Sequence, residues 1–236
     1  MSLTQPRVAE NLVQIRERIA AACTQVGRSP DSVRLVAVTK YAELEWVQDL
    51  LSLGVHDLGE SRPQRLVERA GLIEEPVRWH LIGHLQRNKA RKVLPLVDLA
   101  HSVDTLRLLE TIDRLAEELE LRPRVLLEVN VSGEAAKHGF APDELLANWP
   151  AVLACHCVRV EGLMTMAPRV DDVEDARSSF RGLRELRGRL IETSTDGFEL
   201  PELSMGMSND FEVAIEEGAT IVRIGSCLYN GLSKQG

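Results

Sequence analysis

The segment SMGMSNDFEVAIEEGATIVRIGS, residues 204–226, follows a short apolar run and contains a glycine-bearing polar loop, a helical segment and a second apolar run. The helical segment Asp210–Glu217 is followed by Gly218, and a glycine in this place is typical of a helix C-terminus. Ile221–Ile224 has the β-branched residues that strands prefer. A strand, a helix and a strand in this order favour two parallel strands joined by a helical crossover.

The same alternation of short apolar runs and helically spaced segments continues through the rest of the 236 residues. It favours a parallel sheet covered by helices, and eight strands favour closure into a single (β/α)8 barrel of the TIM type over residues 1–236, with an extra N-terminal helix. An open, doubly wound sheet is the alternative. We expect strands at 33–39, 55–58, 77–82, 97–101, 124–131, 158–164, 202–204 and 221–224, and helices at 8–26, 43–53, 63–72, 86–94, 106–119 (capped by Asp104), 142–149, 173–191 and 210–217.

The overall charge excludes some classes of partner. With 28 Lys and Arg against 36 Asp and Glu, the net charge is −8, whereas a nucleic-acid or anionic-membrane binder needs a basic surface. No apolar run approaches the roughly 18 residues of a membrane-spanning helix, and the N-terminus has no signal core. We therefore expect a cytoplasmic protein with no nucleic-acid or membrane partner.

Metal-ligand patterns are weak in this sequence. The four cysteines, Cys23, Cys155, Cys157 and Cys227, lack zinc-site spacing and are predicted to be reduced, mostly buried thiols. His80 and His84 lie four residues apart, but the β-like run before them and the intervening Gly83 disfavour a helical ligand pair. We predict no metal site, with His84 as a structural hydrogen-bonding residue.

Lys40 stands out by its position, because it ends the apolar run Leu35–Thr39 and so lies where a barrel strand reaches the active-site face. We expect apolar walls there to desolvate its amine and lower its pKa. The neutral amine can attack an aldehyde, which arginine cannot do. The plain alternative is a strand-end lysine that extends into solvent.

Two donor-rich loops follow the seventh and eighth strands, where barrel enzymes often bind phosphate. Gly206 and Ser208 lie in the first loop, the glycine letting the backbone approach a ligand closely; Gly225 and Ser226 lie in the second, and Arg223 adds a cation. An amine on the first strand opposite such loops suits a phosphorylated aldehyde. Pyridoxal 5′-phosphate (PLP) has both groups; a Schiff-base aldolase acting on a phosphorylated sugar is the alternative.

Several ordered motifs resemble the YggS/PROSC family of pyridoxal phosphate homeostasis proteins, which are similar to the N-terminal domain of alanine racemase. They are LVAVTK at 35–40, DLGESRPQ at 57–64, RWHLIGHLQRNK at 78–89, HSVD at 101–104, VNVSGEAAKHGF at 129–140, EGLMTMAP at 161–168 and the segment 204–226. The resemblance covers about 8–231 and implies an alanine racemase N-terminal-domain-like barrel that is a monomer or a weak dimer.

The resemblance also implies site residues. Lys40 matches the Schiff-base lysine. The positions matching phosphate ligands are Ser208, Arg223, Gly225 and Ser226, and those on motifs that approach the cofactor are His80, Met164 and Met205. Ser61 is a departure, because the family usually has asparagine after Gly59-Glu60, near the cofactor.

Two functions remain open for such a site. The first is a non-catalytic PLP carrier that stores, protects or delivers the cofactor to PLP-dependent client enzymes; the second is a PLP enzyme such as an amino-acid racemase. A racemase needs acid–base groups on both faces of its substrate, and alanine racemase takes one of them from an extra β-domain. Only about ten residues follow Ser226, and neither tyrosine, Tyr41 or Tyr229, is obviously placed as a second base. The sequence therefore favours the carrier.

Overall fold

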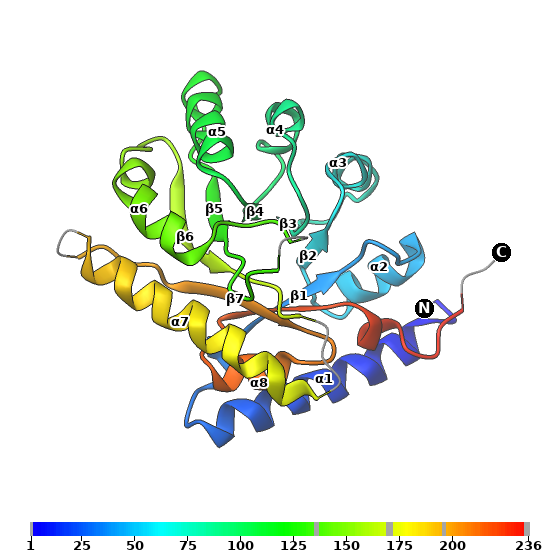
Figure 1. Cartoon of the computed structure of the whole chain (residues 1–236). Helices are drawn as coiled ribbons and strands as arrows, with labels where there is room; N and C mark the ends of the chain where they lie inside the picture. Colours follow the sequence, from blue (N-terminus) through cyan, green and yellow to red (C-terminus); the bar gives the residue numbers. More distant parts are fainter. Residues whose placement is uncertain (1, 135–136, 169–171, 195–196, 234–236) are drawn as a thin grey trace.

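Eight parallel strands close into a barrel in sequence order, with β1 hydrogen-bonded to both β2 and β8, in the computed structural model (Figure 1). The structure describes residues 2–134, 137–168, 172–194 and 197–233. Residues 135 and 136 of the 129–140 motif lie outside the described residues. The predicted (β/α)8 barrel is confirmed, and the open doubly wound sheet is wrong.

The elements alternate as the hydrophobic pattern predicts, with most boundaries shifted by one to three residues. The strands are β1 (Arg34–Val38), β2 (Asp57–Glu60), β3 (Arg78–Leu81), β4 (Leu99–Val103), β5 (Arg124–Glu128), β6 (Arg159–Met164), β7 (Glu202–Met207) and β8 (Ile221–Ile224). The α-helices are α1 (Gln5–Gln25), α2 (Leu44–Ser52), α3 (Pro63–Leu72), α4 (Arg87–Val93), α5 (Leu106–Glu118), α6 (Pro142–Leu153), α7 (Arg177–Glu192) and α8 (Phe211–Glu216). Short 3-10 turns are η1 (Pro30–Ser32), η2 (Val173–Ala176) and η3 (Ser226–Tyr229).

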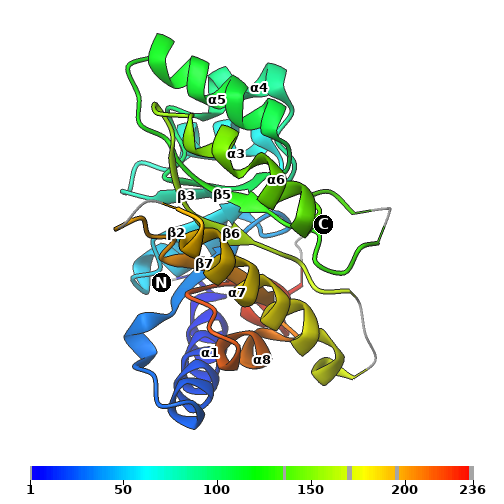
Figure 2. The same ribbon diagram turned by 60° about the vertical axis from the view of Figure 1, so that its left-hand side comes forward.

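Helix α1 is the extra N-terminal helix that the sequence predicts. Its buried stripe includes Val8, Leu12, Ile15 and Ile19, and it packs against α8 and α2. Figure 2 shows α1 and α8 side by side below the barrel. The remaining helices surround the strands, so that every strand is covered by helix on its outer face (Figure 1).

Residues alternate between the barrel interior and the helical layer along each strand. On β8, Ile221 belongs to a small interior cluster with Val36, Leu99, Leu126 and Met164. The neighbouring Val222 belongs instead to the large core between strands and helices. The same period of two decides which side chains face a ligand at the end of the barrel.

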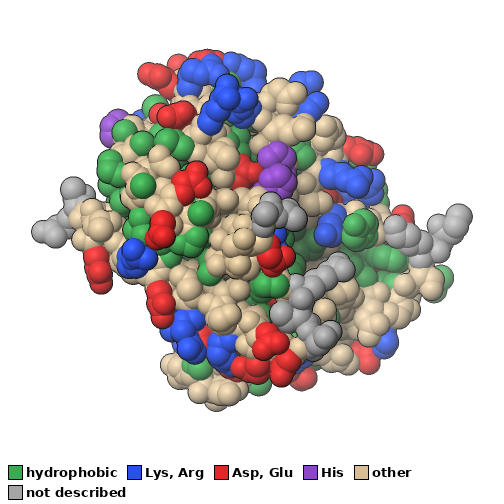
Figure 3. Space-filling model, viewed as in Figure 1, with side chains coloured by type: hydrophobic (Ala, Val, Ile, Leu, Met, Phe, Trp, Pro, Cys, Tyr) green, Lys and Arg blue, Asp and Glu red, His purple; other side chains and the backbone are tan. Residues whose placement is uncertain are grey.

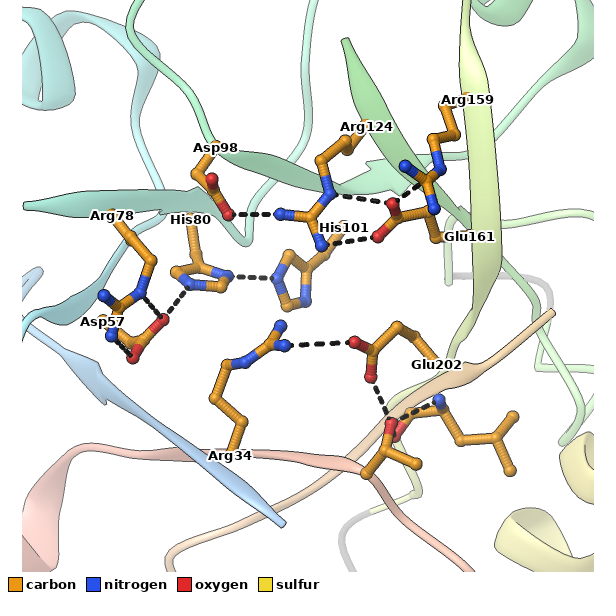
Figure 4. Close-up of polar contacts among 12 residues, drawn as sticks. Arg34, Asp57, Arg78, His80, Asp98, His101, Arg124, Arg159, Glu161 and Glu202 are labelled. Carbon is orange, nitrogen blue, oxygen red and sulfur yellow. Dashed lines mark hydrogen bonds and ion pairs between the residues drawn. The ribbon is translucent and has the colours of Figure 1, made fainter. Parts of the chain in front are cut away.

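Charged residues close the end of the barrel where the strands begin. Arg124 forms ion pairs with Asp98 at 2.9 Å and Glu161 at 2.7 Å, and Arg34 pairs with Glu202 at 3.3 Å (Figure 4). Because this end is filled by paired charges, a ligand enters from the opposite end, where the strands finish. We call that opposite end the mouth.

Two local predictions are wrong. Thr105, not Asp104, caps α5, because its Oγ1 accepts a hydrogen bond from the Leu108 amide at 3.3 Å, while Asp104 binds His84 instead. Only Cys23 is buried; the other three cysteines are half-buried, and all four are free thiols.

Among the described residues, none of the helices combines the length and apolar character needed to cross a membrane.

Candidate functional site

Lys40 lies at the mouth, two residues beyond the end of β1. Val36 faces the interior, so the alternation continued through Val38 directs position 40 toward the mouth. The side chain is exposed, and its Nζ lies 5.2 Å from the centre of the Tyr41 ring. The expected apolar walls are therefore absent around this amine in the described structure, and a small aldehyde can reach it from solvent.

A cavity of about 270 Å³ opens beside this amine. It is lined by Lys40, Tyr41, Glu60, Ser61, Arg62 and Arg65. The structure thus brings Ser61 to Lys40, as the resemblance implied. Sequence reasoning missed Arg62, in the turn after β2, and Arg65, in the first turn of α3. Neither forms an ion pair within the described part of the chain.

A buried ion pair supports this side of the mouth. Glu60 is fully buried, accepts a hydrogen bond from Thr39 Oγ1 at 2.8 Å and forms an ion pair with Arg69 Nε at 3.0 Å. Arg69, on α3, also donates to the carbonyl of Ala42. These contacts tie α3 to the end of β1 and to the turn after Lys40, which fixes the backbone that presents the amine.

The two loops predicted to hold phosphate do meet in the structure. The backbone N–H of Gly225 donates to Ser208 Oγ at 3.1 Å. A Cβ at Gly225 would lie 3.4 Å from the Cβ of Val38, so the end of β8 packs closely on the end of β1. This contact places the Ser208 hydroxyl and the Gly225 backbone on the Lys40 side of the mouth, with Ser226, which is exposed, as the next residue.

Gly206 has a different role from the one expected. Its φ is +88°, and a Cβ there would lie 2.6 Å from Ala214 Cβ and 2.9 Å from Phe211 Cα. The glycine therefore permits close packing of the loop on α8 and a left-handed backbone conformation. Packing and backbone conformation therefore require glycine at position 206, and the expected close approach to a ligand does not.

Arg223 enters the barrel interior from β8 and is almost completely buried. Its Nη1 donates to Ser204 Oγ at 2.6 Å and its Nη2 to the carbonyl of Thr165 at 2.9 Å. Burial lowers the pKa of Arg223 to about 10, against the opposing effect of Asp210, so the guanidinium is charged at neutral pH. Since no described contact joins it to Ser208 or Gly225, its predicted role as a phosphate ligand stays a prediction.

A chain of hydrogen bonds runs from Arg223 through the barrel to the charged end. Ser204 Oγ lies 2.8 Å from His101 Nδ1, His101 Nε2 lies 2.9 Å from His80 Nδ1, and His80 Nε2 lies 3.0 Å from Asp57 Oδ1. Figure 4 shows the His80–His101 and His80–Asp57 contacts. All the side chains between its two ends are buried.

One arrangement of protons satisfies every contact in this chain. Burial lowers the pKa of His101 well below its ordinary value and the nearby charge of Arg223 adds to the effect, so that ring is neutral. An arginine can only donate, so Ser204 accepts from Arg223 and gives its own proton to His101 Nδ1. His101 then donates to His80, and His80 donates to Asp57. The chain holds Arg223 in one orientation.

Asp57 anchors this chain and also accepts two hydrogen bonds from Arg78, at 2.9 and 2.6 Å. Burial alone would raise the pKa of Asp57, but the hydrogen bonds from Arg78 and His80 outweigh it and hold the pKa well below its usual range. A carboxyl group with a lowered pKa stabilises the folded state above its unfolded-state pKa, about 4, and this contribution is lost as the pH falls.

We therefore expect Asp57→Asn to lower the free energy of unfolding at pH 7 by about 1.5–3 kcal/mol, the range for charged hydrogen bonds. The difference in unfolding free energy from the wild type is expected to shrink as the pH falls toward about 3. The stabilisation that the ionised Asp57 carboxylate gives the folded wild type is being lost in that range. Urea unfolding at both pH values measures it. An equal difference at both would contradict the proposed charge on Asp57.

Three residues implied by the resemblance have separate outcomes. Met205 is fully buried in the core between strands and helices, because its neighbour Ser204 faces the interior; this burial does not support its predicted approach to the cofactor, which stays a prediction. Met164 faces the barrel interior and stays a candidate. His80 uses both ring nitrogens inside the barrel, so it acts on the mouth through His101 and Ser204.

Comparison with known proteins gives consistent matches. The family model for the N-terminal domain of alanine racemase matches residues 10–233. A protein of Aquifex aeolicus named "Pyridoxal phosphate homeostasis protein" is 40% identical over 221 residues, which are 93% of this chain and 96% of that protein. One of the same name from Pseudomonas aeruginosa is 39% identical over 226 residues, 94% of each.

Solved structures agree with these relatives. PipY of Synechococcus elongatus, in a structure with PLP bound, has a TM-score of 0.81 and 33% identity, covering 92% of this chain and 100% of its own. An alanine racemase of Clostridium difficile, at 16% identity and a TM-score of 0.73, shares the fold; this chain spans 57% of it.

The fold and the site together define a class of protein: eight-stranded barrels that carry a lysine and a hydroxyl–amide pair at the mouth. The chain belongs to the alanine racemase N-terminal domain family and, within it, to the pyridoxal phosphate homeostasis proteins, the family that its motifs resemble.

Proposed function

We propose that this protein binds PLP as a Schiff base on Lys40 and acts in PLP homeostasis inside the cell, by storage, protection or delivery, without robust catalysis. The observation that carries the proposal is the exposed Lys40 amine after β1, whose end packs on Gly225 after β8, with the Gly225 amide hydrogen-bonded to Ser208 after β7. The names of the relatives and the PLP-bound PipY structure support the choice of cofactor.

The donor groups at the mouth suit the chemistry of PLP. An aldehyde condenses with the primary amine of Lys40 with loss of water. Ser208, Gly225 and Ser226 offer hydroxyl and backbone donors of the kind that hold a phosphate. Arg223 offers a fixed positive charge at the floor of the mouth, and Met164 an apolar surface for the ring.

Two observations favour a carrier over a racemase. The Lys40 side chain is exposed, and a solvated amine favours exchange of the bound aldehyde over carbanion chemistry, which needs a closed site. Tyr229 cannot serve as a second base at the mouth, because its hydroxyl is buried and its ring stacks on Trp46 with ring centres 5.5 Å apart. Burial raises the pKa of its hydroxyl further.

A titration of the purified protein with PLP tests the proposal. We expect a visible absorbance that saturates at one equivalent; an aldolase lysine gives no such colour. No absorbance at excess PLP would overturn the proposal. Prolonged incubation with each amino acid in both chiral forms tests for turnover, and a rate well above that of free PLP would favour the racemase.

Substitutions in the two loops test where the phosphate binds. We expect Ser208→Ala and Arg223→Gln each to weaken PLP retention by about tenfold or more, because a hydrogen bond to a charged group contributes about 1.5–3 kcal/mol. Ser208→Ala should leave the binding of pyridoxal, which lacks the phosphate, unchanged. Equilibrium dialysis with both ligands measures the effects.

Arg62→Gln is the matched comparison, because Arg62 lines the cavity on the other side of Lys40. We expect it to leave PLP retention within about twofold, as for a screened surface charge. If Arg62→Gln weakens the binding of PLP but not of pyridoxal, while Ser208→Ala has no effect, the phosphate lies beside α3 and not at the β7 and β8 loops.

The setting of this function is part of the proposal. We expect a cytoplasmic monomer or weak dimer that passes PLP to PLP-dependent client enzymes. Sedimentation of the PLP-loaded protein would test the assembly state, and transfer of PLP to an apoenzyme faster than from free solution would test delivery.

A further inference from the structure

Three side chains of metal-binding type converge at the mouth on the side of β3, β4 and β5. His84 follows β3, Asp104 follows β4 and His138 lies in the loop after β5. One ligand atom from each lies within 4.8 Å of the other two. Figure 3 shows histidine side chains exposed near the middle of this face.

The contacts within this cluster leave one imidazole without a hydrogen bond to the carboxylate. His84 Nδ1 lies 2.8 Å from Asp104 Oδ2, which is a hydrogen bond, whereas His138 Nδ1 lies 3.7 Å from the same oxygen. The two rings stack with centres 4.6 Å apart and an interplanar angle of 20°. Two imidazoles therefore face one buried carboxylate, but only His84 is hydrogen-bonded to it. That hydrogen bond does not explain why the His138 ring lies here.

Glu128 provides a second observation that points to a cation. This residue, at the end of β5, is only 5% exposed, and its carboxylate has no hydrogen bond or ion pair within the described residues. The carboxyl group of Glu128 interacts electrostatically with that of Asp104. Two carboxyl groups thus lie close together in a partly desolvated place, which a bound cation would stabilise.

We propose that His84, Asp104 and His138 form a binding site for a divalent transition-metal ion, with Glu128 as a neighbouring carboxylate. Two imidazole nitrogens and one carboxylate oxygen suit Zn²⁺ or Co²⁺, whereas Mg²⁺ and Ca²⁺ prefer oxygen ligands alone. Three protein ligands leave a position open toward the mouth, where water or a small molecule can bind.

Small rotations of the two histidines suffice to form the site. Tetrahedral Zn²⁺ with ligands at about 2.0–2.2 Å needs ligand atoms about 3.3 Å apart, and the three ligand atoms here lie within 4.8 Å of one another. The His84 and His138 side chains are 44% and 65% exposed, so solvent leaves both rings room to adjust, while Asp104, 5% exposed, is buried. The helical His80–His84 pair considered from the sequence is not this site, because His80 is committed inside the barrel.

The test is a titration of the untagged, PLP-free protein, after removal of metal by a chelator, with Co²⁺ and Zn²⁺. We expect one equivalent to bind, with a visible Co²⁺ spectrum typical of nitrogen and oxygen ligands. His138→Ala is expected to lower the affinity at least about tenfold. Because binding is read without PLP, failure of this proposal and of the proposed function are distinguishable.

Cys155, His156 and Cys157 offer potential competing metal ligands in the loop between α6 and the start of β6, away from the mouth, so His156→Ala is the control. It should leave the affinity unchanged. Three results would overturn the proposal: no binding at micromolar metal, unchanged affinity in both His84→Ala and His138→Ala, or a thiolate-to-Co²⁺ absorbance that disappears in His156→Ala.

Discussion

Lys40→Ala is expected to abolish the visible absorbance that appears when PLP is added to the wild-type protein. The amine of Lys40 is exposed at the mouth and adjacent to the end of β8, and among the described residues no other lysine lies in the segments that directly follow β1, β7 or β8. Without a primary amine no Schiff base forms, and arginine at this position cannot substitute. Absorbance spectra of both proteins, titrated with PLP, measure the loss.

Lys92→Ala is the control for this experiment, because Lys92 is exposed on α4, away from the mouth. It should bind PLP as the wild type does. Lys40→Ala is expected to retain weaker, colourless binding through the phosphate donors. If its absorbance persists and disappears in a variant of another lysine, the site has been assigned to the wrong residue.

The second large effect concerns the barrel itself, at Gly162. This residue pairs with Glu202 across β6 and β7, and a Cβ there would lie 1.9 Å from the Glu202 carbonyl oxygen. The clashing atom is backbone and cannot move without separating the two strands. We expect Gly162→Ala to lower the free energy of unfolding by about 3 kcal/mol or more, at the upper end for overpacked cores, or to prevent folding.

Gly188→Ala gives the opposite expected sign. Gly188 lies within α7, and a Cβ there would meet nothing within 4 Å. Alanine should stabilise the helix by about 0.5–1 kcal/mol. Urea unfolding of both variants measures the difference. Equal stability of Gly162→Ala and the wild type would mean that β6 and β7 are not paired as described.

The alternation of apolar runs and helical segments was sufficient to predict the closed barrel, because each parallel strand needs a helical crossover and a covered outer face. The placement of Lys40 and the meeting of Ser208 with Gly225 followed from the same argument, since the ends of parallel strands gather at one end of the barrel. These features depend on element order, which periodicity reveals.

Contacts between distant elements were not predictable in the same way. Met205 was expected near a ligand. Because Ser204 faces the barrel interior, the next residue, Met205, faces the helical layer. Asp104 was expected to cap α5, but its tertiary partner His84 competes for the carboxylate. A motif gives the position of a residue along the chain, whereas its side-chain direction depends on the phase of the strand and on neighbours from other strands.

Borohydride reduction of the PLP-treated protein, followed by proteolysis and peptide mapping, tests the central claim most directly. Reduction converts a Schiff base into a stable secondary amine, so the modified lysine is identified by mass. The proposed function predicts a single pyridoxyl group, on Lys40. A protein that carries no label, or carries it mainly on another lysine such as Lys89, Lys92 or Lys137, would contradict it.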